Sequence, residues 1–258
     1  MKKFLSKWKL VLRVIPFLAV ILAAKYAVHF SGNEFLQLNS LLGALISANV
    51  FLIGFLITGV LSDYKEAEKI PSELACSVEA IADECFIMHE NGKTKNSKQC
   101  LEHMVVFLTM LMDWFQKKAR THQVMQKLFE FNHYFLKFEK DTQANFIVRM
   151  KQELQLIRKM IHRIHNIREM SFVQSGYTIV ETITFVLITG LIFTKIDPYY
   201  ESVFFVAFVS FFLIYMIFFL KDLDNPFGYY ENDSIEEVSL KPIADARKYL
   251  QLRIESLK

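Results

Sequence analysis

Four long apolar blocks constrain this chain more than any other feature of its sequence. They are residues 14–30, 41–61, 172–193 and 203–220, and together they carry almost no charge. A helix rises 1.5 Å per residue and the hydrocarbon core of a bilayer is about 30 Å thick, so roughly 20 apolar residues are needed to span it. The blocks therefore predict four transmembrane helices.

The composition agrees with a chain of segregated apolar and polar parts. Of the 258 residues, 53% are hydrophobic and 22% are charged, whereas soluble domains are about 45–50% apolar. The net charge of +3 is too balanced to favour nucleic acid, which needs a concentrated basic surface. Three cysteines without paired spacing predict reduced thiols and no disulfide framework.

The charges beside the blocks predict the orientation. Residues 1–13 hold five basic residues and no acid, whereas the short loops 31–40 and 194–202 hold Lys195 against three acids. Cytoplasmic flanks are enriched in Lys and Arg, so we expect both termini to be cytoplasmic, in a bacterial inner membrane or plasma membrane. The first block lacks a small-residue cleavage site, so it is interpreted as a span and not as a signal peptide.

These blocks predict an all-α integral membrane protein with a helical cytoplasmic domain inserted between the second and third spans. The predicted segments are a basic N-terminus (1–13), two spans (14–61), the cytoplasmic domain (62–171), two further spans (172–220) and a cytoplasmic C-terminal segment (221–258).

The inserted domain has one Pro and one Gly, which favours long helices. We expect helices over 62–90 and 98–138, and a third that begins after Asp141 as its N-cap and continues into the third span. An apolar stripe at helical spacing predicts the buried face of this third helix. Its members are Ile147, Met150, Leu154, Ile157, Ile161 and Ile164.

Enzyme signatures are absent from the sequence. It contains no Gly-rich phosphate loop, no nucleophile elbow and no paired cysteines at zinc spacing, so we expect no enzyme activity. His162, His165 and Glu169 share one helical face and have the chemistry to hold a metal between subunits. A solvated polar stripe is favoured, because neighbouring arginines repel a cation. No catalytic residue, metal or cofactor is expected.

Lys25 and Glu181 are charges within the predicted spans. Isolated ions are costly there and usually face a partner or a water-filled cavity. Structural pairing is favoured for both. Lys25 lies near the end of its helix and has the alternative of extending to the headgroups, and Arg13 is the expected partner of Glu181.

The second span carries a more specific pattern. Ser47, Phe51 and Phe55 are four residues apart and so lie on one helical face. Periodicity alone favours packing of this face in the core. If copies of the helix surround an axis, the same face forms a polar ring and two aromatic rings, and narrow aromatic rings can gate a pore by dewetting.

Other residues of this span complete the candidate pore. Asn49 and Thr58 are polar side chains assigned to it with Ser47, Phe51 and Phe55. Gly43, Gly54 and Gly59 allow neighbouring helices to approach closely, as small residues do in membranes.

Two motifs resemble those of a known family. The pattern Phe-x-x-Gly-Phe-x-x-Thr at residues 51–58, followed by Asp63-Tyr64, resembles the pore-lining second helix of bestrophin channels. Residues 224–233 resemble the bestrophin segment in which Asn-Pro-Phe-Gly precedes an acidic run. Residues 64–69 resemble the bacterial and plant proteins grouped as bestrophin-like.

The resemblance implies a ring of subunits, five in known bestrophins, around one ion pathway. Phe51 and Phe55 match the aromatic neck positions of the family, and Ser47 falls where the family usually has an aliphatic residue. A polar ring wets more easily, so a shorter hydrophobic gate and a different selectivity are expected.

The second motif is a possible ion or structural motif. Its residues are Asp224, Asn225, Pro226, Phe227, Gly228, Glu231 and Asp233. Even with Glu236 and Glu237 it is less dense than the calcium clasp of animal bestrophins, and a hard cation prefers six to eight oxygen ligands. A helix end at Pro226 with solvated acids is favoured over a weak Ca²⁺ site.

These features predict a bestrophin-like channel that conducts small ions passively, with chloride favoured. The expected partners are membrane lipid, inorganic ions and further copies of the chain, with a pentamer favoured. A cation channel of the same architecture is one alternative. Another is a membrane-anchored scaffold or sensor in which the stripe Ile147 to Ile164 binds a partner. Secondary transport is disfavoured, because no inverted repeat is visible.

Overall fold

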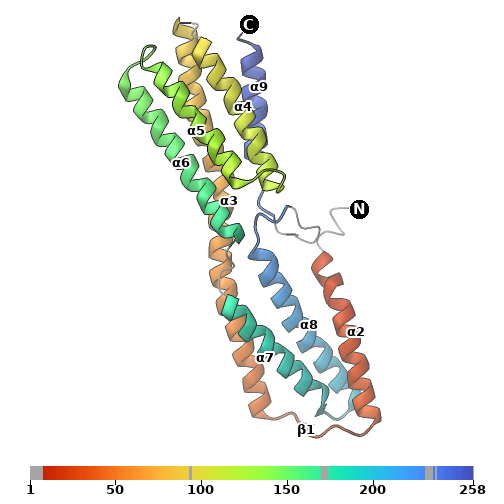
Figure 1. The fold of residues 1–258 in the computed structure, drawn as a ribbon. Coiled ribbons are helices and arrows are strands. Elements are labelled where there is room, and N and C mark those ends of the chain that lie inside the picture. The colour runs from red at the N-terminus through yellow and green to blue at the C-terminus, as the bar shows by residue number, and fades with distance from the viewer. Residues whose placement is uncertain (1–7, 93–94, 170–173, 230–234, 236, 258) are drawn as a thin grey trace. The chain divides into compact units, whose positions relative to one another are not determined.

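A computed structural model of the chain contains two compact units (Figure 1). The apolar unit comprises residues 1–64 and 171–225, and the polar unit comprises residues 65–170 and 226–258. The structure describes residues 8–92, 95–169, 174–229, 235 and 237–257.

Among the residues that the structure describes, the apolar unit is built from four helices. They are α2 (Lys9–Phe30), the first part of α3 (Ser40–Gly92), α7 (Gln174–Ile192) and α8 (Tyr199–Leu223). Among the described residues, four helices are long and apolar enough to cross a membrane, and the four predicted spans lie on them. The core of this unit joins α3, α7 and α8 through Ile53, Leu56, Val60, Val180, Leu187, Leu213, Ile217, Leu220 and Leu223.

Both interhelical connections of the apolar unit meet at one end. The strands β1 (Leu36–Gln37) and β2 (Thr194–Lys195) pair in parallel between the α2–α3 and α7–α8 connections. Asn39 precedes α3, and its side-chain oxygen accepts a hydrogen bond of 2.9 Å from the backbone N–H of Leu42. This is an N-cap, which explains why α3 begins at Ser40.

In its described residues, the polar unit contains the second part of α3 and four further helices. They are α4 (Lys95–Phe115), α5 (Thr121–Phe138), α6 (Ala144–Glu169) and α9 (Lys241–Glu255). The predicted stripe of α6 is confirmed, since all six of its residues are buried. Three ion pairs tie α6 and α9 to α3, between Arg163 and Glu66 (2.7 Å), Arg149 and Glu84 (3.3 Å), and Arg253 and Asp83 (3.0 Å). As expected, α3 runs on from the second span into this unit without a break.

The prediction of one helix over 98–138 is wrong, because α4 ends at Phe115. Lys117 has a φ of 55°, in the left-handed region. Its N–H donates to the carbonyl of Trp114, and the N–H of Lys118 donates to the carbonyl of Asp113. These two bonds form a Schellman motif, which usually has Gly at the left-handed position. Because Lys117 stands in that position instead of Gly, the sequence pattern does not indicate the helix end.

The prediction of Asp141 as an N-cap is also wrong. The helix α6 begins at Ala144. The backbone N–H of Asp141 instead donates a 2.9 Å hydrogen bond to the carbonyl of Phe138. Asp141 therefore belongs to the turn that follows α5.

Replacing Ile157 by Ala should lower the free energy of unfolding by about 2–5 kcal/mol, because the change leaves a cavity in the core of the polar unit. Leu156 is a matched control, since it is the preceding residue of α6 and is 44% exposed, against 1% for Ile157. Leu156→Ala should change the free energy by about 0.5 kcal/mol or less. Thermal unfolding of the purified chain measures both, and equal losses would contradict the packing described.

Candidate functional site

One face of α3 in the apolar unit is exposed along its length. Phe51 and Phe55 are 73% and 70% exposed, and Ser47 and Thr58 are exposed on the same face. The opposite face is buried in the core described above. Core packing of this stripe, favoured by periodicity alone, is therefore wrong within a single chain.

The polar side chains of this face are already hydrogen-bonded. The Ser47 hydroxyl donates to the carbonyl of Gly43, and the Thr58 hydroxyl donates to the carbonyl of Gly54, both at 2.9 Å. Each hydroxyl proton is therefore used inside the helix, so the oxygen lone pairs are the groups left to face outward.

Two glycines of α3 are open to an approaching chain. A Cβ atom added at Gly43 or Gly54 would meet no atom within 4 Å. No other described segment of this chain therefore needs these glycines for close packing. A helix of a second copy is the kind of partner that small residues admit in a membrane.

Asn49 does not lie on the exposed face, which corrects its assignment to the pore. Its side chain is fully buried, and its amide donates a 2.9 Å hydrogen bond to the Thr184 hydroxyl of α7. Asn49 follows Ser47 by two residues, which is about 200° around a helix of 3.6 residues per turn. The helical repeat therefore already indicated that Asn49 and Ser47 lie on opposite faces of α3.

Lys25 is fully buried at the end of the apolar unit where β1 and β2 pair. Its ammonium group donates to the Glu34 carboxylate at 2.6 Å, to the Thr194 carbonyl at 2.5 Å and to the Ile192 carbonyl at 3.3 Å. These three bonds use all three donors of the ammonium group. The alternative in which Lys25 extends to the headgroups is therefore wrong, and the charge is paired.

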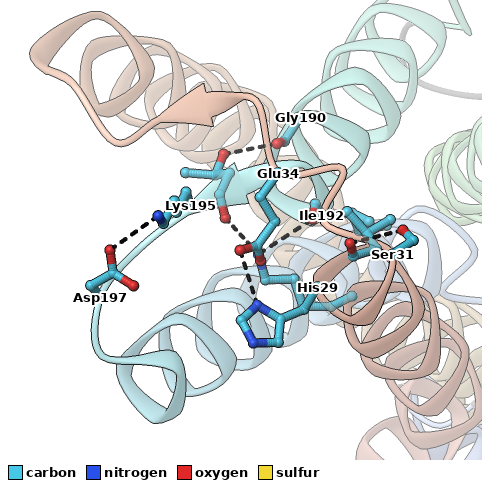
Figure 2. Close-up of polar contacts among 10 residues, drawn as sticks. His29, Ser31, Glu34, Gly190, Ile192, Lys195 and Asp197 are labelled. Atoms are coloured by element: carbon cyan, nitrogen blue, oxygen red, sulfur yellow. Dashed lines mark hydrogen bonds and ion pairs between the residues drawn. The ribbon is translucent and has the colours of Figure 1, made fainter.

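Glu34 completes this group, which we name the Lys25 cluster (Lys25, His29, Glu34 and the carbonyls of Ile192 and Thr194). Figure 2 shows Glu34 facing His29, whose Nδ1 lies 3.0 Å from the carboxylate. The His29 ring stacks on Tyr199, with 3.9 Å between centroids. Burial raises the pKa of Glu34, whereas the hydrogen bonds from Lys25 and His29 lower it. The lowering effects together outweigh burial, so the pKa lies below its usual value of 4.5.

Glu181 is also paired, but its partner differs from the expected Arg13. The carboxylate lies 2.6 Å from the ammonium group of Lys221, and both side chains are half-exposed. Lys221 directly follows the apolar block 203–220. Arg13 of α2 and Lys221 of α8 both lie on other helices than Glu181, and the sequence alone does not give the helix packing that decides between them.

The motif at residues 224–228 ends α8 and begins the C-terminal part of the polar unit. Asp224 is the C-cap of α8, and Pro226 follows two residues later, which confirms the predicted helix end. Phe227 is fully buried and packs on Phe115, with 5.6 Å between ring centroids. Asn225 precedes Pro226, and Gly228 follows Phe227.

The candidate Ca²⁺ ligands of this motif are only partly described. Glu231, Asp233 and Glu236 lie outside the described residues, whereas Asp224 and Glu237 lie within them. In the part of the chain that the structure describes, no group of three His, Cys, Asp or Glu side chains has the arrangement to hold a metal. His162 and Glu169 are exposed on α6, and His165 lies 3.5 Å from the Thr121 hydroxyl.

Replacing Lys25 by Met should lower the free energy of unfolding by about 3–5 kcal/mol, because it leaves the Glu34 charge without its buried partner. Lys195→Met is the matched control, since Lys195 pairs with Asp197 at 3.6 Å and both side chains are exposed. That change should cost less than about 1 kcal/mol. Thermal unfolding of the detergent-purified chain compares them, and a loss for Lys25→Met no greater than the control would overturn the assignment.

The stability that Glu34 contributes should depend on pH. A carboxyl whose pKa is lowered by folding stabilises the fold above its unfolded pKa, and this contribution is lost as the pH falls through the folded pKa. The advantage of the wild type over Glu34→Gln should therefore be complete at neutral pH and shrink once the pH falls below about 4.5. Melting temperatures of both proteins across this range test the sign, and a difference that grows on acidification would refute it.

Comparisons with known proteins agree on the fold. No family model matches the chain, and no curated protein matches it by sequence. A solved bacterial bestrophin homologue from Klebsiella pneumoniae is 14% identical, with a TM-score of 0.74, and the match covers 96% of this chain and 98% of that one. Two mutants of a bestrophin homologue from the same organism are 13% and 12% identical, with TM-scores of 0.75 and 0.76, covering 97% and 95% of this chain and 99% and 98% of theirs. The resemblance inferred from the two motifs is thus confirmed in structure, and the chain has a bestrophin-like fold.

Proposed function

We propose that the chain forms a homo-oligomeric ion channel, with a pentamer favoured, in which copies of α3 surround one ion pathway. The observation that carries this proposal is the exposed stripe of α3, with Phe51 and Phe55 at its centre. The fold shared with bacterial bestrophin homologues supports it.

The two faces of α3 give this stripe its role. One face packs against α7 and α8, so the other is available to meet its own copies around an axis. In such a ring, Phe51 and Phe55 form two apolar constrictions, which gate an ion pathway by excluding water. Gly43 and Gly54 leave room for the neighbouring helices.

The membrane topology completes the proposal. Both termini and the polar unit lie on the cytoplasmic side of a bacterial inner membrane or plasma membrane. The basic N-terminus supports this orientation, because segments rich in Lys and Arg beside a span stay on the cytoplasmic side. The channel needs no cofactor.

Chloride is the favoured ion, as the bestrophin resemblance implies. Conduction of cations is the second candidate, and one observation favours it. The hydroxyl protons of Ser47 and Thr58 are donated to their own helix, so a ring of these residues presents oxygen lone pairs to the pathway. Oxygen ligands suit cations.

A scaffold or sensor is the proposal from a different class. Its support was the α6 stripe from Ile147 to Ile164 as a surface for a partner. These residues are buried within the chain, so this surface is already occupied.

Ion flux into liposomes tests the channel. Phe51→Ala and Phe55→Ala should each raise the basal flux about tenfold or more, because a smaller side chain widens and wets the constriction. Phe204→Ala is the matched control, since Phe204 of α8 is equally exposed, at 72%, but lies outside the stripe. Its flux should equal that of the wild type.

The same assay separates the candidates when chloride, sodium and potassium gradients are applied in turn. Flux under chloride gradients alone supports the anion channel, and flux under sodium or potassium gradients with an impermeant anion supports the cation channel. No flux from any variant, in protein shown to be folded and oligomeric, would contradict the proposed channel.

A further inference from the structure

A pocket of about 260 Å³ lies in the polar unit, where the turn between α4 and α5 meets the last residues of α6. The residues that line it lie outside α3, so the pocket is separate from the candidate pore face. Its ionisable and hydroxyl side chains are Lys117, Arg120, Thr121, His165, Arg168 and Glu169.

The charge of this pocket is positive. Three cationic side chains line it, those of Lys117, Arg120 and Arg168, against the single carboxylate of Glu169. The same charges that disfavour a metal ion beside His165 attract an anion. The pocket is smaller than the about 300–1,000 Å³ of most small-molecule sites, so it suits one anionic group better than a whole nucleotide or cofactor.

Arg168 is held in position by Trp114. Its guanidinium group lies 5.0 Å from the centroid of the Trp114 ring and donates a 3.1 Å hydrogen bond to the Trp114 carbonyl. Trp114 is itself buried, and its indole N–H donates to the Thr121 hydroxyl at 3.1 Å. A guanidinium group fixed in this way loses little conformational entropy when it binds an anion.

The N-terminus of α5 borders the same pocket. Arg120 is the N-cap of this 18-residue helix and Thr121 is its first residue, and both line the pocket. A helix N-terminus carries a partial positive charge and amide donors. Together with the three cations it provides the setting in which phosphate groups are commonly bound.

The backbone at Lys117 gives a further reason to assign a function to this pocket. Its φ of 55° is a conformation in which side chains other than glycine are strained. Glycine is the usual residue at this position of a Schellman motif, but Lys117 instead adds a cation to the wall of the pocket. Strained residues of this kind occur preferentially at functional sites.

We propose that this pocket binds a phosphate group that carries two negative charges, held by Lys117, Arg120 and Arg168 at the N-terminus of α5. Two negative charges balance three cations and one carboxylate, whereas a carboxylate or a chloride ion brings only one. A phosphate monoester carries about two at neutral pH.

This phosphate group has two sources, a soluble phosphate and the headgroup of a lipid that ends in a phosphate monoester. The lipid is within reach, because Glu169 precedes the apolar block 172–193 by three residues, or at most about 11 Å of chain. The proposal does not depend on ion conduction, so it stands or falls separately from the proposed channel.

Isothermal titration calorimetry of the detergent-purified chain tests the pocket with sodium phosphate and with a water-soluble, short-chain phosphatidic acid, at constant ionic strength and mildly alkaline pH. Arg120→Gln should weaken the binding seen for the wild type about tenfold or more, because one charge-assisted hydrogen bond is lost. Lys118→Gln is the matched control, since Lys118 is an exposed cation of the same turn that does not line the pocket. Its affinity should equal that of the wild type.

Lys117→Gly separates binding from folding. It should weaken phosphate binding about tenfold, as Arg120→Gln does. Its melting temperature should equal or exceed that of the wild type, because glycine adopts the left-handed conformation without strain.

The two ligands distinguish the sources. Binding of sodium phosphate assigns a soluble phosphate to the pocket, and binding of phosphatidic acid alone assigns the lipid headgroup. The proposal is overturned if the wild type binds neither ligand, or if Lys118→Gln weakens binding as much as Arg120→Gln. It is also overturned if Lys117→Gly binds as tightly as the wild type, because the ligand then lies outside this pocket.

Discussion

In hydrocarbon there is no water to hydrogen-bond a backbone amide, and this constraint shapes the whole apolar unit. A helix satisfies this constraint because its interior N–H and C=O groups hydrogen-bond to one another within one segment. The polar side chains of the spans follow the same rule. Ser47, Thr58 and Thr189 each donate to the carbonyl four residues earlier. Their hydroxyl protons are therefore used within their own helices, and only oxygen lone pairs face outward.

The same constraint explains how α3 is oriented. A buried amide needs a partner, and Asn49 finds one in Thr184 of α7. This bond and the apolar core hold one side of α3 against α7 and α8. Phe51 and Phe55 consequently point away from the core, although their size and hydrophobicity are those of core residues. Exposure of large aromatic side chains in this way marks a surface that lipid or another chain covers.

Much of the fold follows from local sequence patterns, whereas the partners of the site residues depend on contacts between residues far apart in the chain. The apolar blocks and the six-residue stripe of α6 are periodic features, so they were predictable from the chain alone. The end of α4 was not, because Lys117 occupies a position where glycine is the usual signal. Ion-pair partners were also missed, since Glu181 meets Lys221 through the packing of two helices. The position of Asn49 relative to Ser47 was available from the helical repeat.

The Lys25 cluster has a consequence for the order in which the protein is made. Lys25 bonds to the carbonyl of Thr194, which lies 169 residues further along the chain, but Glu34 is only nine residues away. As the chain is synthesised from its N-terminus, the first two spans emerge long before the last two exist. The carboxylate is then the one partner of the ammonium group already present, so the charge can be neutralised inside the first hairpin. The carbonyls of Ile192 and Thr194 complete its shell when the third span arrives, and the late-made half of the unit docks onto a site that the early half has prepared.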